Sequence, residues 1–173
     1  MSVNTKKLLL HKLLKLLPLI LLYFSVLNEL DLNFLNFKYF SFNFTFILIY
    51  FWSLKSSENL GYGHIFFSGI INDVVIGYPI GVSAFTYLFI CGFAAYLRNI
   101  TLRPNLLNDW LFFLFTILVV SSINYSLLIL FFSLKFNYYD ISANILFTFL
   151  LYYLFRYLFD IYDRLVFKAV KND

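Results

Sequence analysis

The sequence predicts an all-α integral membrane protein, folded as one compact bundle of six transmembrane helices. Of its 173 residues, 62% are hydrophobic and only 13% are charged. Long charge-poor runs recur from Leu13 to Asp163, whereas a soluble domain of this length carries about twice as many charged residues. Lysine and arginine also gather on one side of the expected bundle, as they do in membrane proteins. The whole chain, residues 1–173, is therefore expected to form a single transmembrane domain.

The first span is expected at residues 13–27, behind a short basic arm. A secretory signal peptide shares this basic start and apolar middle, but it ends in small residues that permit cleavage. This run ends instead in SVLNE at residues 25–29. An uncleaved helix is therefore predicted, with Pro18 tolerated near its cytoplasmic end.

The second span is expected at residues 37–54, where phenylalanine partly alternates with polar residues from Phe40 to Phe46. Alternation of this kind is typical of a β-strand. A single strand in lipid would leave its backbone groups unpaired, so a helix is expected instead. The third span is expected at residues 60–76. His64 lies near its start and is interpreted either as a proton switch or as an interfacial, hydrogen-bonded residue.

The fourth span, residues 80–97, carries Gly92 and Ala95, which suit a close crossing with another helix. The fifth span, residues 110–132, contains a polar cluster that either lines a cavity or is satisfied by neighbouring groups. The cluster consists of Ser121, Ser122, Asn124 and Ser126.

The sixth span is expected at residues 141–159. Arg156–Asp160 and Asp160–Arg164 are pairs of opposite charge four residues apart, a spacing that modestly stabilises a helix. The helix is therefore predicted to continue beyond the membrane.

Residues 69–81, GIINDVVIGYPIG, form the most distinctive stretch of the chain. Gly69, Asp73 and Gly77 are spaced by four and would share one face of a helix. Pro79 stops helix propagation, and Gly77 and Gly81 flank that break. We expect a helical hairpin that turns at the far side of the membrane, with its small residues at a close helix contact or a partner-binding face.

Asp73 has two interpretations. A carboxylate inside a membrane is commonly an interaction site or part of a proton pathway. It is equally consistent with a helix-end group that is hydrogen-bonded to nearby backbone. An aspartate close to the interface costs much less than one at the bilayer centre, so both interpretations stay open.

The sequence carries no recognisable catalytic or cofactor-binding motif, such as GxSxG, HExxH, CxxC or a P-loop. Its single cysteine, Cys91, and two separated histidines do not have metal-ligand spacing. The 24 phenylalanines and 14 tyrosines are expected to face lipid and the membrane interface. A non-enzymatic protein without metal, cofactor or nucleic-acid ligand is therefore predicted.

The basic residues predict the orientation in the membrane. With six spans, both termini lie on one side, and ten of the lysines and arginines fall there while two fall opposite. The positive-inside rule then places both termini in the cytoplasm. The ten are Lys6, Lys7, Lys12, Lys15, Lys55, Arg98, Arg103, Arg164, Lys168 and Lys171, and the two are Lys38 and Lys135.

The pattern of Gly69, Asp73, Gly77, Pro79 and Gly81, followed by an apolar helix, resembles the MreD family of bacterial inner-membrane proteins. The chain length, basic start and closely spaced apolar runs agree with that resemblance. It implies a non-catalytic scaffold or adaptor of the rod-shape elongation machinery, which supports lateral peptidoglycan synthesis and cell shape. The implied partners are a single-span MreC-like protein and, indirectly, MreB, a RodA-type glycosyltransferase and a class B penicillin-binding protein.

The resemblance also implies a fold related to the substrate-binding components of energy-coupling-factor transporters. This relation leaves an alternative function, a membrane subunit that binds a small vitamin-type molecule. In that case Asp73 and the polar cluster of the fifth span would line its pocket.

Overall fold

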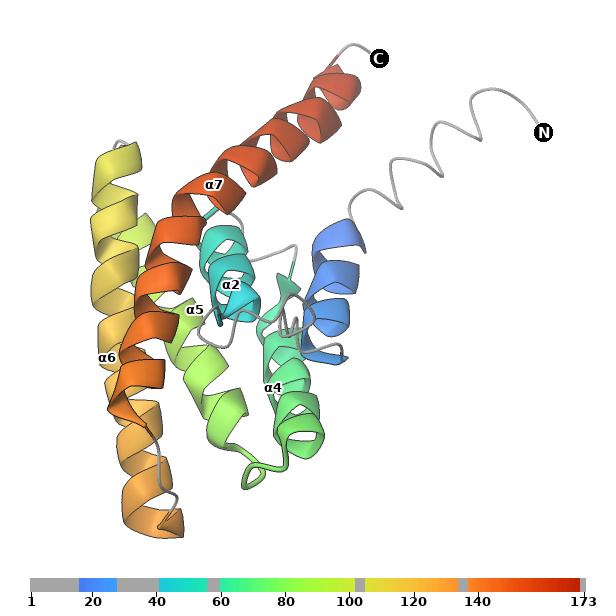
Figure 1. The fold of residues 1–173 in the computed structure, drawn as a ribbon. Helices are drawn as coiled ribbons and strands as arrows, with labels where there is room; N and C mark the ends of the chain where they lie inside the picture. Colours follow the sequence, from blue (N-terminus) through green and yellow to red (C-terminus); the bar gives the residue numbers. More distant parts are fainter. Residues whose placement is uncertain (1–15, 28–40, 56–59, 102–104, 134–136, 172–173) are drawn as a thin grey trace, which may run out of the picture.

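The computed structural model is all-helical over the residues it describes, which are 16–27, 41–55, 60–101, 105–133 and 137–171 (Figure 1). These residues form six helices, which confirms the predicted all-α class. Of the alternating phenylalanines, Phe44 and Phe46 lie in helix α2 and Phe42 precedes it, while Phe40 lies outside the described residues. The helices are an N-terminal helix Leu16–Leu27, α2 Phe44–Lys55, α4 Tyr62–Ile76, α5 Val82–Ile100, α6 Leu106–Phe132 and α7 Tyr138–Lys171.

Successive helices run in opposite directions along the bundle (Figure 1). The start of the N-terminal helix and the end of α7 therefore lie at the same end, here called the terminal end. The turn between α4 and α5 lies at the opposite end, here called the hairpin end. This alternation is the arrangement that six consecutive spans require.

The short helix α2 lies at the centre of the bundle. Nine of its twelve residues, from Thr45 to Ser53, are buried, as expected for a helix that is apolar on all sides. It packs against α5 and α7. Twelve residues span about 18 Å, so α2 is shorter than the expected span 37–54, of which residues 37–40 lie outside the described part of the chain.

The two long helices α6 and α7 form an outer wall beside α2 (Figure 1). Among the described helices, Leu106–Phe132 and the segment Tyr138–Arg164 of α7 are long and apolar enough to cross a membrane. The N-terminal helix, α2 and α4 are apolar but shorter.

Helix α7 continues to Lys171, which confirms the predicted extension of the sixth span. Of the two ion pairs expected along it, Arg156–Asp160 is present, with 3.8 Å between Nε and Oδ2. The pair Asp160–Arg164 was predicted wrongly, because Asp160 instead contacts the Lys55 ammonium of α2 at 2.7 Å. A contact between two helices has replaced a contact along one helix.

Two smaller expectations are decided by packing. A Cβ at Gly92 would have no neighbouring atom within 4 Å, so a close crossing at Gly92 is wrong for the described part of the chain. His64 is exposed, and its Nδ1 lies 3.3 Å from the Tyr23 hydroxyl. That contact agrees with the interfacial, hydrogen-bonded interpretation of this histidine.

Candidate functional site

The hairpin between α4 and α5 is closed by the backbone around Asp73. Helix α4 ends at Ile76, and Gly77 adopts a left-handed conformation with φ of 78° while its N–H donates to the Asp73 carbonyl. The N–H of Tyr78 donates to the same carbonyl at 2.8 Å. A left-handed glycine after the last helical turn is a common helix C-cap, so the predicted helix stop has a local cause.

The Asp73 carboxylate reaches across the turn to the start of α5. Its Oδ2 accepts from the Gly81 N–H at 2.7 Å and its Oδ1 from the Ser83 N–H at 2.9 Å. The side chain is fully buried. Gly81 has no side chain with which to cap α5, and the first turn of α5 has no acidic residue. Asp73 thus caps α5 from the preceding helix, with its negative charge at the positive helix end.

This geometry matches the helix-end interpretation of Asp73. Both carboxylate oxygens are engaged by backbone N–H groups within the hairpin. A carboxylate held this way joins α4 to α5 and orients the two helices.

The glycines of the motif have two different roles. A Cβ at Gly69 would lie closer than 3.0 Å to backbone atoms of Ala84 and Ser83, so α4 and α5 touch there backbone to backbone. A Cβ at Gly77 or Gly81 would meet nothing within 4 Å. The expectation that Gly77 and Gly81 lie at a close helix contact is therefore wrong. They serve the turn instead, with φ values of 78° and 105° that glycine adopts most readily.

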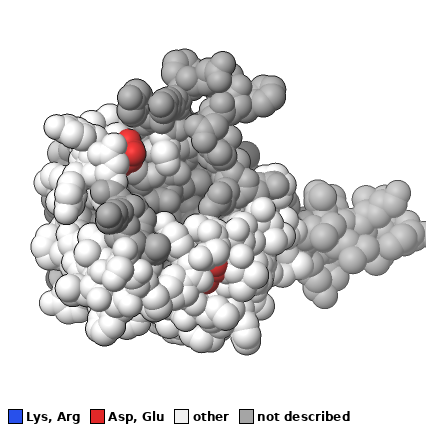
Figure 2. Space-filling view, turned by 60° about the horizontal axis from the view of Figure 1, so that its bottom comes forward, with Lys and Arg blue, Asp and Glu red and all other residues white. Residues whose placement is uncertain are grey.

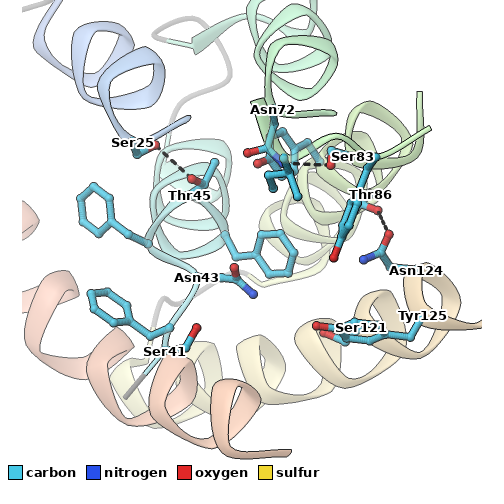
Figure 3. Close-up of a pocket in the computed structure, with 16 residues that line it drawn as sticks. Ser25, Ser41, Asn43, Thr45, Asn72, Ser83, Thr86, Ser121, Asn124 and Tyr125 are labelled. Carbon is cyan, nitrogen blue, oxygen red and sulfur yellow. Dashed lines mark hydrogen bonds between the residues drawn. The ribbon is translucent and has the colours of Figure 1, made fainter. Parts of the chain in front are cut away.

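A polar cavity of about 360 Å³ adjoins the hairpin at the same end of the bundle (Figure 3). It lies at the start of the short helix α2, between that helix, α4, α5, α6 and the N-terminal helix. The polar cluster of α6, expected either to line a cavity or to be satisfied by neighbouring groups, is divided between two sides of the helix. Ser121 and Asn124 line the cavity, whereas Ser122 and Ser126 are exposed on the outside of the helix.

Hydrogen bonds between helices hold the cavity wall in place (Figure 3). The Asn72 carboxamide donates to the Ser83 hydroxyl at 3.0 Å, which links α4 to α5. The Thr86 hydroxyl donates to Asn124 Oδ1 at 3.2 Å, which links α5 to α6. The Ser25 and Thr45 hydroxyls lie 3.0 Å apart and link the N-terminal helix to α2.

A charged network at the terminal end was not predicted from the sequence. Arg156 Nη1 of α7 lies 2.7 Å from Asp109 Oδ2 of α6, and both side chains are nearly buried. Nearby, Lys55 contacts Asp160 at 2.7 Å and Asp163 at 2.8 Å. Asp109 lies just before the expected fifth span, residues 110–132, and had no predicted role. The presence of Arg156 in an apolar span could have indicated this pair, because an arginine there usually has an acidic partner.

The described residues contain no group of three or more histidines, cysteines or acidic residues that would hold a metal ion. Cys91 is buried and accepts a hydrogen bond from the Ser53 hydroxyl at 3.2 Å, so it is a packed residue. The arrangement is suited to two tasks: contact with other membrane helices, and binding of an uncharged polar group in the cavity.

Asp73→Asn is expected to lower the free energy of unfolding by about 1–3 kcal/mol, the usual cost of an unsatisfied buried group. The amide keeps one acceptor oxygen, but its NH₂ faces a backbone N–H that it cannot accept from. The measurement is SDS-induced unfolding of the purified protein in detergent. Asp140→Asn, at an exposed carboxylate on α7, is the control and should cost much less. Equal stability of both variants would contradict the capping role.

Comparison with known proteins identifies a family. A family model described as rod shape-determining protein MreD matches residues 11–162. No curated protein matches the chain, and no solved structure does. The likeness to energy-coupling-factor components expected from the sequence has therefore gained no support.

Proposed function

Because the chain belongs to the MreD family of rod shape-determining proteins, we propose that it is a non-catalytic scaffold of the cell-elongation machinery. Membership implies a role in rod-shape determination, and the family is not known to be enzymatic. The proposal adds that this chain supports lateral peptidoglycan synthesis by holding other membrane proteins in place.

The division of the exposed surface between short connections and long apolar helix faces supports a scaffold. The connections between α4 and α5, between α5 and α6 and between α6 and α7 are short, at residues 77–81, 101–105 and 133–137. By contrast, α6 and α7 expose large apolar side chains along their length, among them Phe115, Leu130 and Tyr157. A chain of this shape contacts partners mainly through lipid-facing helix surfaces, where close packing drives association.

We further propose that the six helices span the bacterial inner membrane with both termini in the cytoplasm. Among the described residues, Lys55 ends α2 and Arg98 lies in the last turn of α5. Arg156 and Arg164 lie in the second half of α7. All three helices run toward the terminal end (Figure 1). Figure 2, which brings the hairpin end forward, shows acidic but no basic side chains among the residues that the structure describes. This asymmetry supports a cytoplasmic terminal end and an outer hairpin end.

Alkaline phosphatase fusions test this orientation. A fusion after Tyr78 should be active, because the hairpin end would lie outside the cytoplasm. A fusion after Arg103 should be inactive, because the connection between α5 and α6 lies at the terminal end. The opposite pattern would exclude the six-span arrangement.

The proposed direct partner is a single-span MreC-like protein. Through it the chain would associate with MreB, a RodA-type glycosyltransferase and a class B penicillin-binding protein. Affinity purification of the tagged protein in mild detergent, followed by mass spectrometry, should recover the single-span partner above an unrelated polytopic control. Absence of that partner, or consumption of a lipid-linked wall precursor by the purified protein alone, would contradict a scaffold.

The polar cavity favours one alternative, a membrane subunit that binds a vitamin-type small molecule. Its volume of about 360 Å³ falls in the range of small-molecule sites. Mass spectrometry of compounds released from the purified, denatured protein distinguishes the two functions. A stoichiometric vitamin without a recovered single-span protein would favour the transport subunit.

A further inference from the structure

We propose that the polar cavity at the hairpin end binds a neutral, polyhydroxylated group, such as a sugar. The proposal rests on the chemistry of the cavity wall. It holds whether or not the chain acts as a scaffold, so the two are tested separately.

The wall selects against charged and purely apolar ligands. Of the sixteen described residues that line it, twelve carry a hydroxyl, phenol or carboxamide, and none of these sixteen carries a formal charge. A charged ligand would lose its hydration without gaining a counter-charge. A hydrocarbon would leave without a partner each wall group that is not bonded within the wall, such as the Ser121 hydroxyl, at a cost of about 1–3 kcal/mol for each such group. A ligand with several neutral donors and acceptors avoids both costs.

Ser121 is one wall group with unused hydrogen-bonding capacity. The residue is only 5% exposed and lines the cavity, and Figure 3 shows it on the cavity side of α6. Its hydroxyl has no hydrogen-bond partner among the described residues. Because this hydroxyl borders the cavity, it is placed to bond an oxygen of a ligand there. The bonds of Thr86 to Asn124 and of Asn72 to Ser83 keep the surrounding wall preorganised.

The N-terminal end of α2 adds a positive partial charge to the cavity wall. The first turn of α2 borders the cavity and contains no acidic residue, so the positive end of its dipole favours an electronegative oxygen. Phe42, Phe44 and Phe46 also line the cavity. Aromatic rings offer negative faces to which the C–H groups of a sugar ring are attracted. Hydroxyls on the rim and C–H groups on the face are the combination that a sugar presents.

Two sources supply this chemistry: the headgroup of a membrane glycolipid, or a free saccharide. The full-length protein in lipid nanodiscs is titrated with glucosyl-diacylglycerol, with maltose and, as an anionic control, with phosphatidylglycerol. Native mass spectrometry counts the bound molecules, and isothermal titration gives the affinity. Saturable binding of glucosyl-diacylglycerol alone identifies a headgroup site, and binding of maltose as well identifies recognition of the saccharide itself.

Two adjacent serines of α6 provide a matched pair of variants. Ser121→Ala removes the cavity hydroxyl and should weaken binding about two- to tenfold, the effect of losing one hydrogen bond. Ser122→Ala changes an exposed hydroxyl on the same helix and should leave binding unchanged. Ser121→Leu, which also fills space in the cavity, should weaken binding further. Thermal unfolding of each variant establishes that it is folded.

Three outcomes would overturn the proposal. The first is that neither sugar compound binds better than phosphatidylglycerol, which leaves a water-filled cavity. The second is that a peptide of a co-purified protein occupies the site. The third is that Ser121→Ala and Ser122→Ala weaken binding equally, which moves the binding site elsewhere.

Discussion

Gly69→Leu is expected to destabilise the protein by about 3 kcal/mol, the upper end of the usual cost of overpacking. A Cβ at this position would overlap backbone atoms of Ala84 and Ser83. Backbone atoms cannot rotate away as the end of a flexible side chain does, so α4 and α5 would have to separate. Separation would also stretch the hydrogen bonds from Asp73 to the start of α5.

Gly63→Leu on the same helix is the matched control. A Cβ at Gly63 meets nothing within 4 Å, and the residue is exposed. Leucine also forms helix better than glycine, by roughly 0.5–1 kcal/mol, so Gly63→Leu should be neutral or stabilising. SDS-induced unfolding and accumulation in membranes measure both variants. Equal losses would mean that the α4–α5 contact does not hold the hairpin together.

Arg156→Met is expected to cost about 3–5 kcal/mol, the effect of breaking a buried ion pair from one side. The Asp109 carboxylate, which is only 2% exposed as a residue, would remain buried without its cation. The contact between α6 and α7 at the terminal end would weaken as a result. The unfolding transition in detergent should shift accordingly.

The double variant Asp109→Leu/Arg156→Met separates charge from packing. With both charges removed, the apolar replacements should recover most of the lost stability. Lys55→Met is the control for an exposed pair, because Lys55 is 36% exposed as a side chain and such pairs contribute at most about 1 kcal/mol. A double variant as unstable as the sum of the single ones would show that the two residues do not act as a pair.

Local rules of the chain predicted the helical class and the hairpin. Pro79 has no N–H, Gly77 and Gly81 accept left-handed backbone, and these properties hold in any fold. The choice of helix over strand for the alternating phenylalanines was likewise a matter of backbone hydrogen bonding. The motif at residues 69–81, together with the chain length, the basic start and the closely spaced apolar runs, also indicated the family, which the match over residues 11–162 confirms.

Lengths of helices and burial of whole elements were predicted less well. The residues of α2 form an apolar run like those of the other helices, yet α2 is the short central helix. Hydropathy records that a run avoids water, and it does not distinguish lipid from protein as the apolar surroundings. The cavity could not be predicted for the same reason. It borders the start of α2, and hydropathy does not show that α2 is surrounded by protein and not by lipid.

By itself, the sequence determined which residues turn the chain, which segments are helical and which family the chain belongs to. Only the tertiary structure decided that Gly69 makes the close helix contact, that Asp73 caps α5, and that Asp109 meets Arg156. Turns and helices follow from the conformations of neighbouring residues, which the sequence states directly. Contacts between helices depend on the rotation and depth of each helix in the bundle, and these are set only when all the helices pack together.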